Sequence, residues 1–344
     1  MSLKTSLRDN PPLSVRILKE KQFRKYLQER KLTAEDANFS VNSIKEFEEY
    51  LEKKKVSFEC AGLDALKDYV SFLIEEDKNS MDRLVAIARY CNITKKDDYY
   101  VYLVSILGAR NVLPDIGERI ALVAGEATRR KIFQGFELPP LGSPPENYPQ
   151  LTQIIMDKLK AELPNETCRK ILTWNYHKMS AETFKEKKER FERAESIDGY
   201  LKNEHKKFIE DLRGFMKEGR IWYEQKITPE VLDFVKGNQE ICTGVRRGNR
   251  IYLTKIPYAP KQYLEESDPA LKRYYACHCP LVRSALLDRE IKISPMFCYC
   301  SGGYEKFCFD VIFDEPVEVE LIESALKGNT RCRFAIKIPR GKMK

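Results

Sequence analysis

The first part of the chain carries apolar residues at helical spacing. Successive segments place them three or four positions apart, which puts them on one face of an α-helix. Breaks at Gly62, Asn79-Ser80, Asn92 and Pro114 separate these segments. The pattern predicts a bundle of four or five short helices. The apolar stripes are Ile44, Phe47, Tyr50 and Leu51; Leu63, Leu66, Val70 and Leu73; Leu84, Ile87 and Ala88; and Tyr99, Leu103, Ile106 and Leu107.

A proline-rich stretch follows at residues 136–150 and holds Pro139, Pro140, Pro144, Pro145 and Pro149. Proline fixes φ and lacks an N–H donor, so this density stops helices and favours an extended connector. With 344 residues the chain is also too long for one small domain. We therefore expect a helical domain at 1–135, a linker at 136–150 and a second domain at 151–344.

In the second domain the spacing of the apolar residues changes from helical to strand-like along the chain. A long, charged helical region at 181–215, with a break near Ser196, gives way to strand-like alternation. The predicted fold class is α+β, an all-helical N-terminal bundle plus C-terminal helices packed on a small antiparallel sheet. The expected elements are a hairpin over 243–256, a helix over 280–287 with Cys279 near its N-cap, and β-type runs at 291–300, 317–322 and 332–338.

Composition and charge indicate a cellular compartment but say little more about function. Charged residues of both signs are plentiful, and the net charge of +8 is compatible with a nucleic-acid or acidic-lipid partner without requiring one. The first residues have no apolar core of signal-peptide length, and no run approaches the roughly 18 apolar residues of a membrane span. We expect a cytoplasmic protein without a membrane partner. Thiols stay reduced there, so clustered cysteines ligate metal, react or pack.

Six of the ten cysteines fall between Tyr274 and Ile338. Two Cys-x-Cys pairs stand out, because residues i and i+2 of a strand point to one side and can present both sulfurs to one ion. Thiolates suit zinc, and also iron–sulfur clusters or copper. Buried cysteines in a core and a reactive thiol remain open alternatives. The candidate metal ligands are Cys277, Cys279, Cys298, Cys300 and Cys332, with zinc preferred over an iron–sulfur cluster.

Cys279 is the candidate catalytic residue. A helix N-terminus lowers a thiol pKa, and its free N–H groups could hold an oxyanion. His278 is adjacent, but neighbours on an extended chain point opposite ways, which disfavours a Cys–His dyad. Aromatic residues are dense around these cysteines, and core packing competes with a ligand pocket as their explanation. The candidate pocket consists of Tyr275, Phe297, Tyr299, Tyr304 and Phe307, with Glu323 as a polar group.

The C-terminal pattern resembles the four-vinyl-reductase-type ligand-binding domain. The likeness rests on four blocks: Ser301-Gly302-Gly303-Tyr304, Val317-Glu318-Val319-Glu320-Leu321, Gly328-Asn329-Thr330-Arg331-Cys332 and Arg333-Phe334-Ala335-Ile336. The chain also has a Cys-x-Cys at Cys277-His278-Cys279 and the block Phe297-Cys298-Tyr299-Cys300-Ser301-Gly302-Gly303-Tyr304. With these it is more similar still to a Cys-rich prokaryotic branch that includes relatives described as aminothiazoline-carboxylate hydrolases. The resemblance implies a small α+β domain that holds a small apolar or aromatic molecule.

In phenol-sensing members of that resembling family, a structural zinc sits beside the ligand pocket. Three cysteines and one glutamate hold it. Cys298 and Cys332 stand at two of these positions, whereas Ser324 and Leu321 stand near the other two. The resemblance therefore implies that this zinc site is absent or that different thiols build it.

In residues 39–90 a Ser-rich start leads to a helix with Phe47, Tyr50 and Leu51, then to a second helix from Ala65 to Ile74, and then to the segment Ser80 to Tyr90. This order of features resembles the SAM-like core-binding domain of phage integrases and tyrosine recombinases. The resemblance implies DNA contact through basic helices, while a bundle that packs on the other domain or on a partner is the competing interpretation. No recombinase catalytic half follows, so recombination is excluded. The candidate phosphate contacts are Lys53, Lys54, Lys55, Arg83 and Arg89.

Three functions are carried forward. The first is a cytoplasmic, sensor-like protein that binds a small molecule or a metal through a thiolate cluster beside an aromatic pocket, and a homodimer is compatible with it. The second is a Cys-dependent hydrolase of a small C–N or C–S substrate, so enzymatic activity stays open. The third is a DNA-binding regulator that uses the N-terminal helices.

Overall fold

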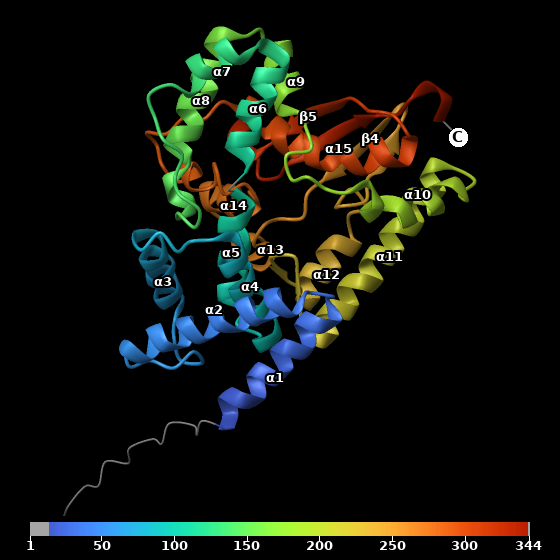
Figure 1. Cartoon of the computed structure of the whole chain (residues 1–344). Coiled ribbons are helices and arrows are strands. Elements are labelled where there is room, and N and C mark those ends of the chain that lie inside the picture. The colour runs from blue at the N-terminus through green and yellow to red at the C-terminus, as the bar shows by residue number, and fades with distance from the viewer. Residues whose placement is uncertain (1–13, 110, 343–344) are drawn as a thin grey trace, which may run out of the picture. The chain divides into compact units, whose positions relative to one another are not determined.

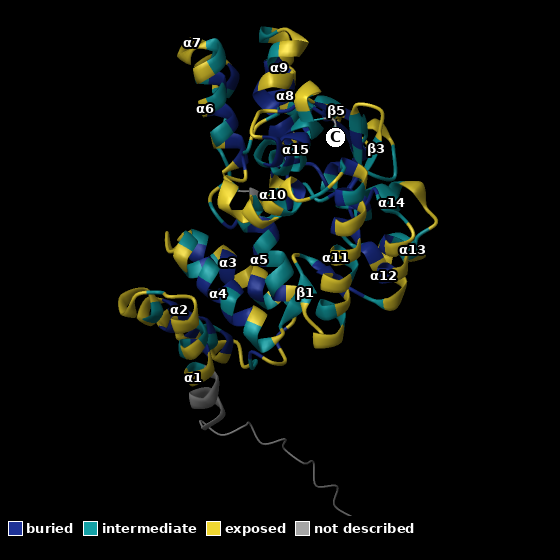
Figure 2. Cartoon of the chain, turned by 90° about the vertical axis from the view of Figure 1, so that its right-hand side faces the viewer, coloured by how far each residue is buried: buried dark blue, intermediate teal, exposed yellow. Residues whose placement is uncertain are grey.

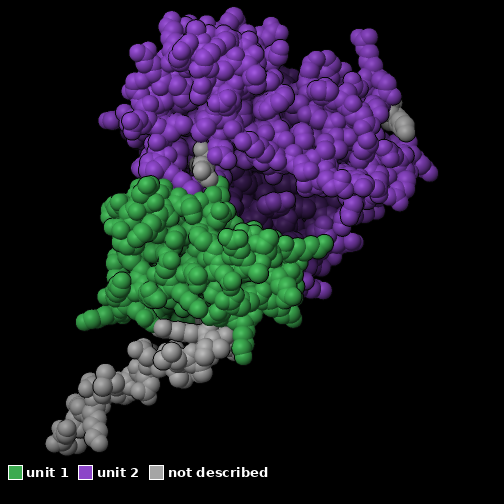
Figure 3. Space-filling view, viewed as in Figure 1, with its two compact units in different colours: residues 1–103 green, residues 104–344 purple. Residues whose placement is uncertain are grey.

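The computed structural model describes residues 14–109 and 111–342. The chain divides into two compact units, Met1–Leu103 and Val104–Lys344 (Figure 3). This division lies well before the proline-rich stretch where a boundary is predicted. The reason is apolar packing: Ile116, Ile120 and Ile132 share one buried core with Tyr148 and with helices that follow it. The proline-rich stretch is thus an internal connection of unit 2.

Unit 1 is a helical bundle with an aromatic core. Phe47 stacks on Tyr69 with ring centroids 4.6 Å apart, and Phe58 meets Tyr90 and Tyr99 edge to face. Such contacts stabilise a core beyond the area they bury. The predicted apolar stripes supply most of this interior. The helices are α1 (Ser14–Glu29), α2 (Ala34–Lys53), α3 (Leu63–Glu75), α4 (Met81–Thr94) and the start of α5 (Asp97–Ala109).

Unit 2 combines helices with two antiparallel sheets, which confirms the α+β class (Figure 1). The smaller sheet pairs β1 (Ile221–Trp222) with β2 (Gln225–Lys226). The helices are α6 (Val112–Ala124), α7 (Glu126–Phe133), α8 (Pro149–Glu162), α9 (Asn165–Leu172), α10 (Lys185–Glu192), α11 (Ile197–Glu218), α12 (Pro229–Lys236), α13 (Pro260–Glu265), α14 (Pro269–Ala276) and α15 (Tyr299–Phe313).

The larger sheet has the strand order β3-β4-β6-β5 and is antiparallel throughout. Its strands are β3 (Val245–Arg247), β4 (Arg250–Thr254), β5 (Val319–Glu323) and β6 (Arg333–Lys337). The predicted hairpin and the two last predicted strands are all present. Residues Cys332, Phe334, Ile336 and Ile338 lie buried in one core cluster, as the alternation predicts. Helix α15 packs on this sheet and covers it through Phe309, Ile312 and Phe313.

Two predicted elements are wrong. Residues 291–300 do not form a strand, because Pro295 starts a short 3₁₀ helix, Pro295–Cys298, that leads directly into α15. Residues 280–287 do not form an α-helix but turns and the 3₁₀ helix Ser284–Leu286. Neither Cys-x-Cys pair therefore lies on a strand. Cys279 is likewise not the N-cap of an α-helix.

The charged region at 181–215 is helical with the predicted break, since α10 ends at Glu192 and α11 begins at Ile197. Along α11, exposed charged residues alternate with buried ones such as Tyr200, Leu201 and Leu212 (Figure 2). In the described part of the chain, no helix is long and apolar enough to cross a membrane.

Candidate functional site

Five thiols from three distant segments come together inside unit 2. Cys277 and Cys279 follow the end of α14, Cys298 and Cys300 flank the start of α15, and Cys332 precedes β6. Cys277 and Cys300 belong to the core formed with α6–α9, whereas Cys332 belongs to the core on the sheet. The thiols thus lie where these two core clusters of unit 2 meet, and all five are free.

Four of these thiols each interact with at least two of the others and are here called the thiol tetrad: Cys277, Cys279, Cys298 and Cys332. Cys277 interacts electrostatically with Cys332, Cys279 and Cys298. Cys298 also interacts with Cys332 and Cys279. Each member is therefore close to at least two others. The fifth thiol, Cys300, interacts with Cys279 and Cys298 and is also near Lys255.

Each tetrad sulfur also meets a main-chain amide. The hydrogen-bonding amides are those of Cys279 for Cys277, Leu281 for Cys279, Leu326 for Cys298 and Ala325 for Cys332. An N–H directed at a sulfur favours its thiolate. Hydrogen bonds of this kind also tune thiolate-bound metals.

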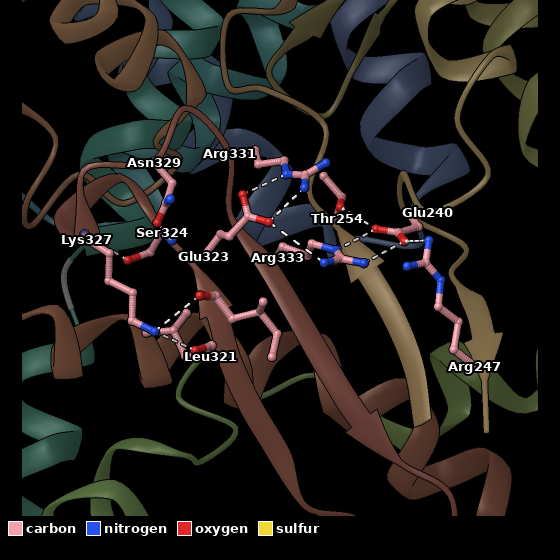
Figure 4. Close-up of polar contacts among 11 residues, drawn as sticks. Glu240, Arg247, Thr254, Leu321, Glu323, Ser324, Lys327, Asn329, Arg331 and Arg333 are labelled. Carbon is pink, nitrogen blue, oxygen red and sulfur yellow. Dashed lines mark hydrogen bonds and ion pairs between the residues drawn. The ribbon is translucent and has the colours of Figure 1, made fainter. Parts of the chain in front are cut away.

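The turn that supplies two of these amides is held rigidly. Ser324 is fully buried, and its hydroxyl accepts a hydrogen bond from the Lys327 amide while it contacts the sulfur of Cys298. Lys327 in turn donates to the carbonyls of Leu321 and Ile322, and Asn329 accepts from the Ser324 amide (Figure 4). Ser324 thus lies beside the tetrad and contacts Cys298 as a hydrogen-bonding side chain.

Burial raises the pKa of every tetrad thiol, so none is a ready thiolate on its own. For Cys279 the neighbouring Cys300 adds to this shift. The sequence predicts the opposite for Cys279, because it expects a helix N-terminus there. Without that helix the basis for a low pKa is lost.

The tetrad has the donors of a metal site, but its sulfurs do not surround one ion position as they lie here, so a single zinc would have to draw them closer together. Among the described residues, no three His, Cys, Asp or Glu side chains converge on one ion position. A tetrahedral zinc with Zn–S bonds of about 2.3 Å requires sulfurs about 3.8 Å apart. A [4Fe–4S] cluster bonds each cysteine sulfur to a different iron, so it can bind thiols that lie farther apart.

A buried cation lies beside the thiols. The ammonium of Lys255, just after β4, donates to Ser301 Oγ at 3.1 Å and pairs with Glu305 at 3.4 Å. It also lies 5.3 Å from the ring centre of Tyr304. Burial opposes its charge, but Glu305, Tyr304 and Cys332 together outweigh that effect, and the pKa of Lys255 lies above its usual range. Lys255 therefore stays positively charged and favours anionic sulfur in Cys279, Cys300 and Cys332.

A second cluster of polar residues lies around His278. Its Nε2 donates to the carbonyl of Ile256 at 2.6 Å, and its Nδ1 lies 4.0 Å from Glu224. Burial, together with the charge of Lys255, lowers the pKa of His278 to about 3. The guanidinium of Arg283 lies 3.7 Å from the ring centre of Tyr258, and its Nη1 has no hydrogen-bond partner among the described residues. His278 is therefore a neutral, structurally held ring rather than the base of Cys279.

The buried carboxyl of Glu224 makes the stability of the fold depend on pH. Burial raises its pKa from 4.5 to about 7, although Arg283 and Lys255 oppose the shift. Between these values the folded protein keeps a proton that the unfolded chain loses, so stability falls as pH rises from about 4.5 to 7. We expect the Glu224→Gln variant to lack this loss, which is on the order of 3 kcal/mol. The measurement is the free energy of urea unfolding at pH 5 and pH 8, and equal pH dependence in both proteins would contradict the assignment.

The predicted aromatic pocket residues are spread over several environments. Phe297 lies in the core, and Tyr275 packs on Tyr274. Tyr299 lies near Arg169, and Tyr304 packs against His177. Phe307 packs against Phe184, and Glu323 pairs with Arg331. A pocket of about 100 Å³ does adjoin the tetrad at Cys332, but none of the six lines it. Their role as a ligand pocket stays a prediction. A second pocket, of about 280 Å³, is lined mainly by apolar residues around Leu113 and Pro139, without a cation or carboxylate.

In unit 1, two of the five predicted phosphate contacts are already paired with carboxylates. Lys54 lies 2.8 Å from Asp68, and Arg83 forms an ion pair with Glu46. Lys53 and Lys55 are exposed, and Arg89 is half-buried. DNA binding stays a prediction.

Part of the chain matches the model of a known protein family. Residues 261–343 match the model of a family of unknown function (DUF6144). This region contains the whole tetrad but less than half of the chain. No curated protein and no solved structure matches the chain.

Proposed function

We propose that unit 2 is a binding module whose thiol tetrad holds a metal centre, and that the protein acts as a sensor-like binding protein rather than as a Cys-dependent hydrolase. The observation that carries this proposal is the tetrad itself. Four thiols come from three segments, and each interacts with at least two of the others. Single core thiols such as Cys91 and Cys242 also meet a main-chain N–H, so the gathering of the thiols, and not the N–H groups alone, supports a metal centre.

The electrostatics around the tetrad support the same function. Four thiolates on zinc, or on a [4Fe–4S] cluster in its 2+ state, carry a net charge of −2. Lys255 interacts with Cys279 and Cys332, and Arg283 interacts with Cys277. These buried cations offset that charge, which is costly to bury alone. Cys277 and Cys279 would replace the ligands that Ser324 and Leu321 cannot supply.

The hydrolase alternative has less support. Burial raises the pKa of Cys279, and no α-helix begins at this residue. Because all ten cysteines are free, the proposal also keeps the cytoplasm as the compartment, where thiols stay reduced.

The test is the metal content of protein purified without chelator. We expect about one zinc, or iron with a matching amount of acid-labile sulfide, per chain. The Cys298→Ser variant should lose at least about nine-tenths of it. This prediction follows because a metal centre rarely keeps its affinity after losing one of four thiolates.

Cys168→Ala is the matched control. Cys168 is as buried as the tetrad thiols and donates weakly to the carbonyls of Leu159 and Leu163, but among the described residues it interacts with no other cysteine. It should keep the full metal content. Equal metal content in the two variants would rule the tetrad out as the ligand set.

A further inference from the structure

The pocket beside Cys332 has an unusual lining for its size. It combines two cations with hydrogen-bonding side chains and contains no carboxylate. The lining residues come from α12, α13, α14, the end of β4 and the turn before β6: Phe234, Asn238, Thr254, Lys255, Pro257, Tyr263, Ala276, Thr330, Arg331 and Cys332. A cavity with cations and no acid on its wall favours an anion.

Both cations keep donors available for such an anion. Arg331 uses Nε and Nη2 for its two bonds to Glu323, at 2.8 and 2.7 Å. Within the described residues this leaves Nη1 with both of its protons. Lys255 has three donors, of which Ser301 and Glu305 take two. The carboxylates that balance these cations lie outside the lining, so they hold the cations in place without filling the pocket.

The neighbouring salt-bridge network fixes the position of Arg331. Arg331 pairs with Glu323, which also lies 3.8 Å from Arg333, and Arg333 makes two bonds to Glu240 (Figure 4). A guanidinium held on one edge presents its other edge in a fixed direction. Such preorganisation lowers the cost of ordering side chains when a ligand binds.

The volume of this pocket limits the size of the ligand that it can hold. About 100 Å³ is well below the roughly 300 Å³ at which pockets for drug-sized molecules begin. It is enough for a group of a few heavy atoms. We propose that this pocket binds a small oxyanion, a carboxylate or a phosphate-like ion, held by Lys255 and Arg331 next to Cys332. This inference does not depend on the metal centre, and it differs from the apolar or aromatic ligand that the sequence resemblance implies.

The test is calorimetric titration of the full chain with sodium acetate, phosphate and sulfate, at an ionic strength held constant with sodium chloride. We expect saturable binding of at least one of the three, and acetate against phosphate separates a planar carboxylate from a tetrahedral ion. Arg331→Gln should weaken binding about tenfold or more, because a charge-assisted hydrogen bond is lost. Arg331 is 42% exposed, so this variant is expected to fold.

Two further variants complete the design. Arg247→Gln is the matched control, because Arg247 pairs with Glu240 in the same network but does not line the pocket. Thr330→Val removes a hydroxyl from the lining without changing charge, and should weaken binding several-fold. Absence of saturable binding for all three anions, or equal affinity in Arg331→Gln and Arg247→Gln, would overturn the proposal.

Discussion

Replacing Gly303 with alanine is expected to destabilise unit 2 by more than about 2 kcal/mol, because backbone and not a flexible side chain blocks the added methyl group. An added Cβ would lie 2.5 Å from the main-chain nitrogen of Trp174 and closer still to its carbonyl oxygen. Either α15 or the segment at Trp174 has to move. Since α15 begins beside Cys298 and Cys300, we also expect the tetrad to be disturbed.

Gly214→Ala is the control for this substitution. Gly214 also lies inside a helix, α11, and an added Cβ would have nothing within 4 Å. The substitution should therefore stabilise by up to about 1 kcal/mol, the usual gain of alanine over glycine in a helix. Urea unfolding followed by tryptophan fluorescence reports on this unit, because both tryptophans, Trp174 and Trp222, lie in it. A change below about 0.5 kcal/mol in Gly303→Ala would show that the close approach is wrong.

Replacing Glu240 with alanine is expected to lower the free energy of unfolding by about 3–5 kcal/mol, the usual loss of stability when one partner of a buried ion pair is removed. Glu240 is 6% exposed and accepts two hydrogen bonds from Arg333, at 2.7 and 2.8 Å. It also accepts from Arg247 and from the hydroxyl of Thr254. Without this carboxylate, Arg333 would be left with the long contact to Glu323 and with its guanidinium 4.7 Å from the ring centre of Tyr252.

Glu318→Ala is the matched control, because Glu318 also pairs across the same sheet, with Lys337 at 3.1 Å. That pair is exposed, so its loss should cost no more than about 1 kcal/mol. The same fluorescence-detected unfolding measures both variants. If the two substitutions cost the same, Glu240 is not the buried centre of this network.

The features that the sequence predicts correctly are those encoded by neighbouring residues. The alternation from Cys332 to Ile338 corresponds to β6, and the Gly248-Asn249 turn joins β3 to β4. Errors arise where distant packing decides. The proline-rich stretch predicts a domain boundary from its sequence. In the structure, however, Ile116 and Ile132 before it pack in the same core as Ile155 after it.

The site was only partly visible in the sequence for the same reason. Spacing identified the five thiols, although the argument that each pair lies on a strand was wrong. Lys255, Glu224 and Arg283 were missed because no motif links them to the cysteines. The signal that could have identified Lys255 is a lone lysine within the otherwise largely apolar run from Ile251 to Pro257. For Glu224, in the turn between β1 and β2, no such signal exists.

The metal centre is tested most directly by X-ray absorption spectroscopy at the zinc or iron edge, on the full chain purified without chelator. We expect a first shell made only of sulfur, with metal–sulfur distances of about 2.3 Å. For iron, we also expect a metal–metal distance characteristic of a cluster. A first shell of nitrogen or oxygen, or protein that binds no stoichiometric metal, would contradict a metal centre on Cys277, Cys279, Cys298 and Cys332.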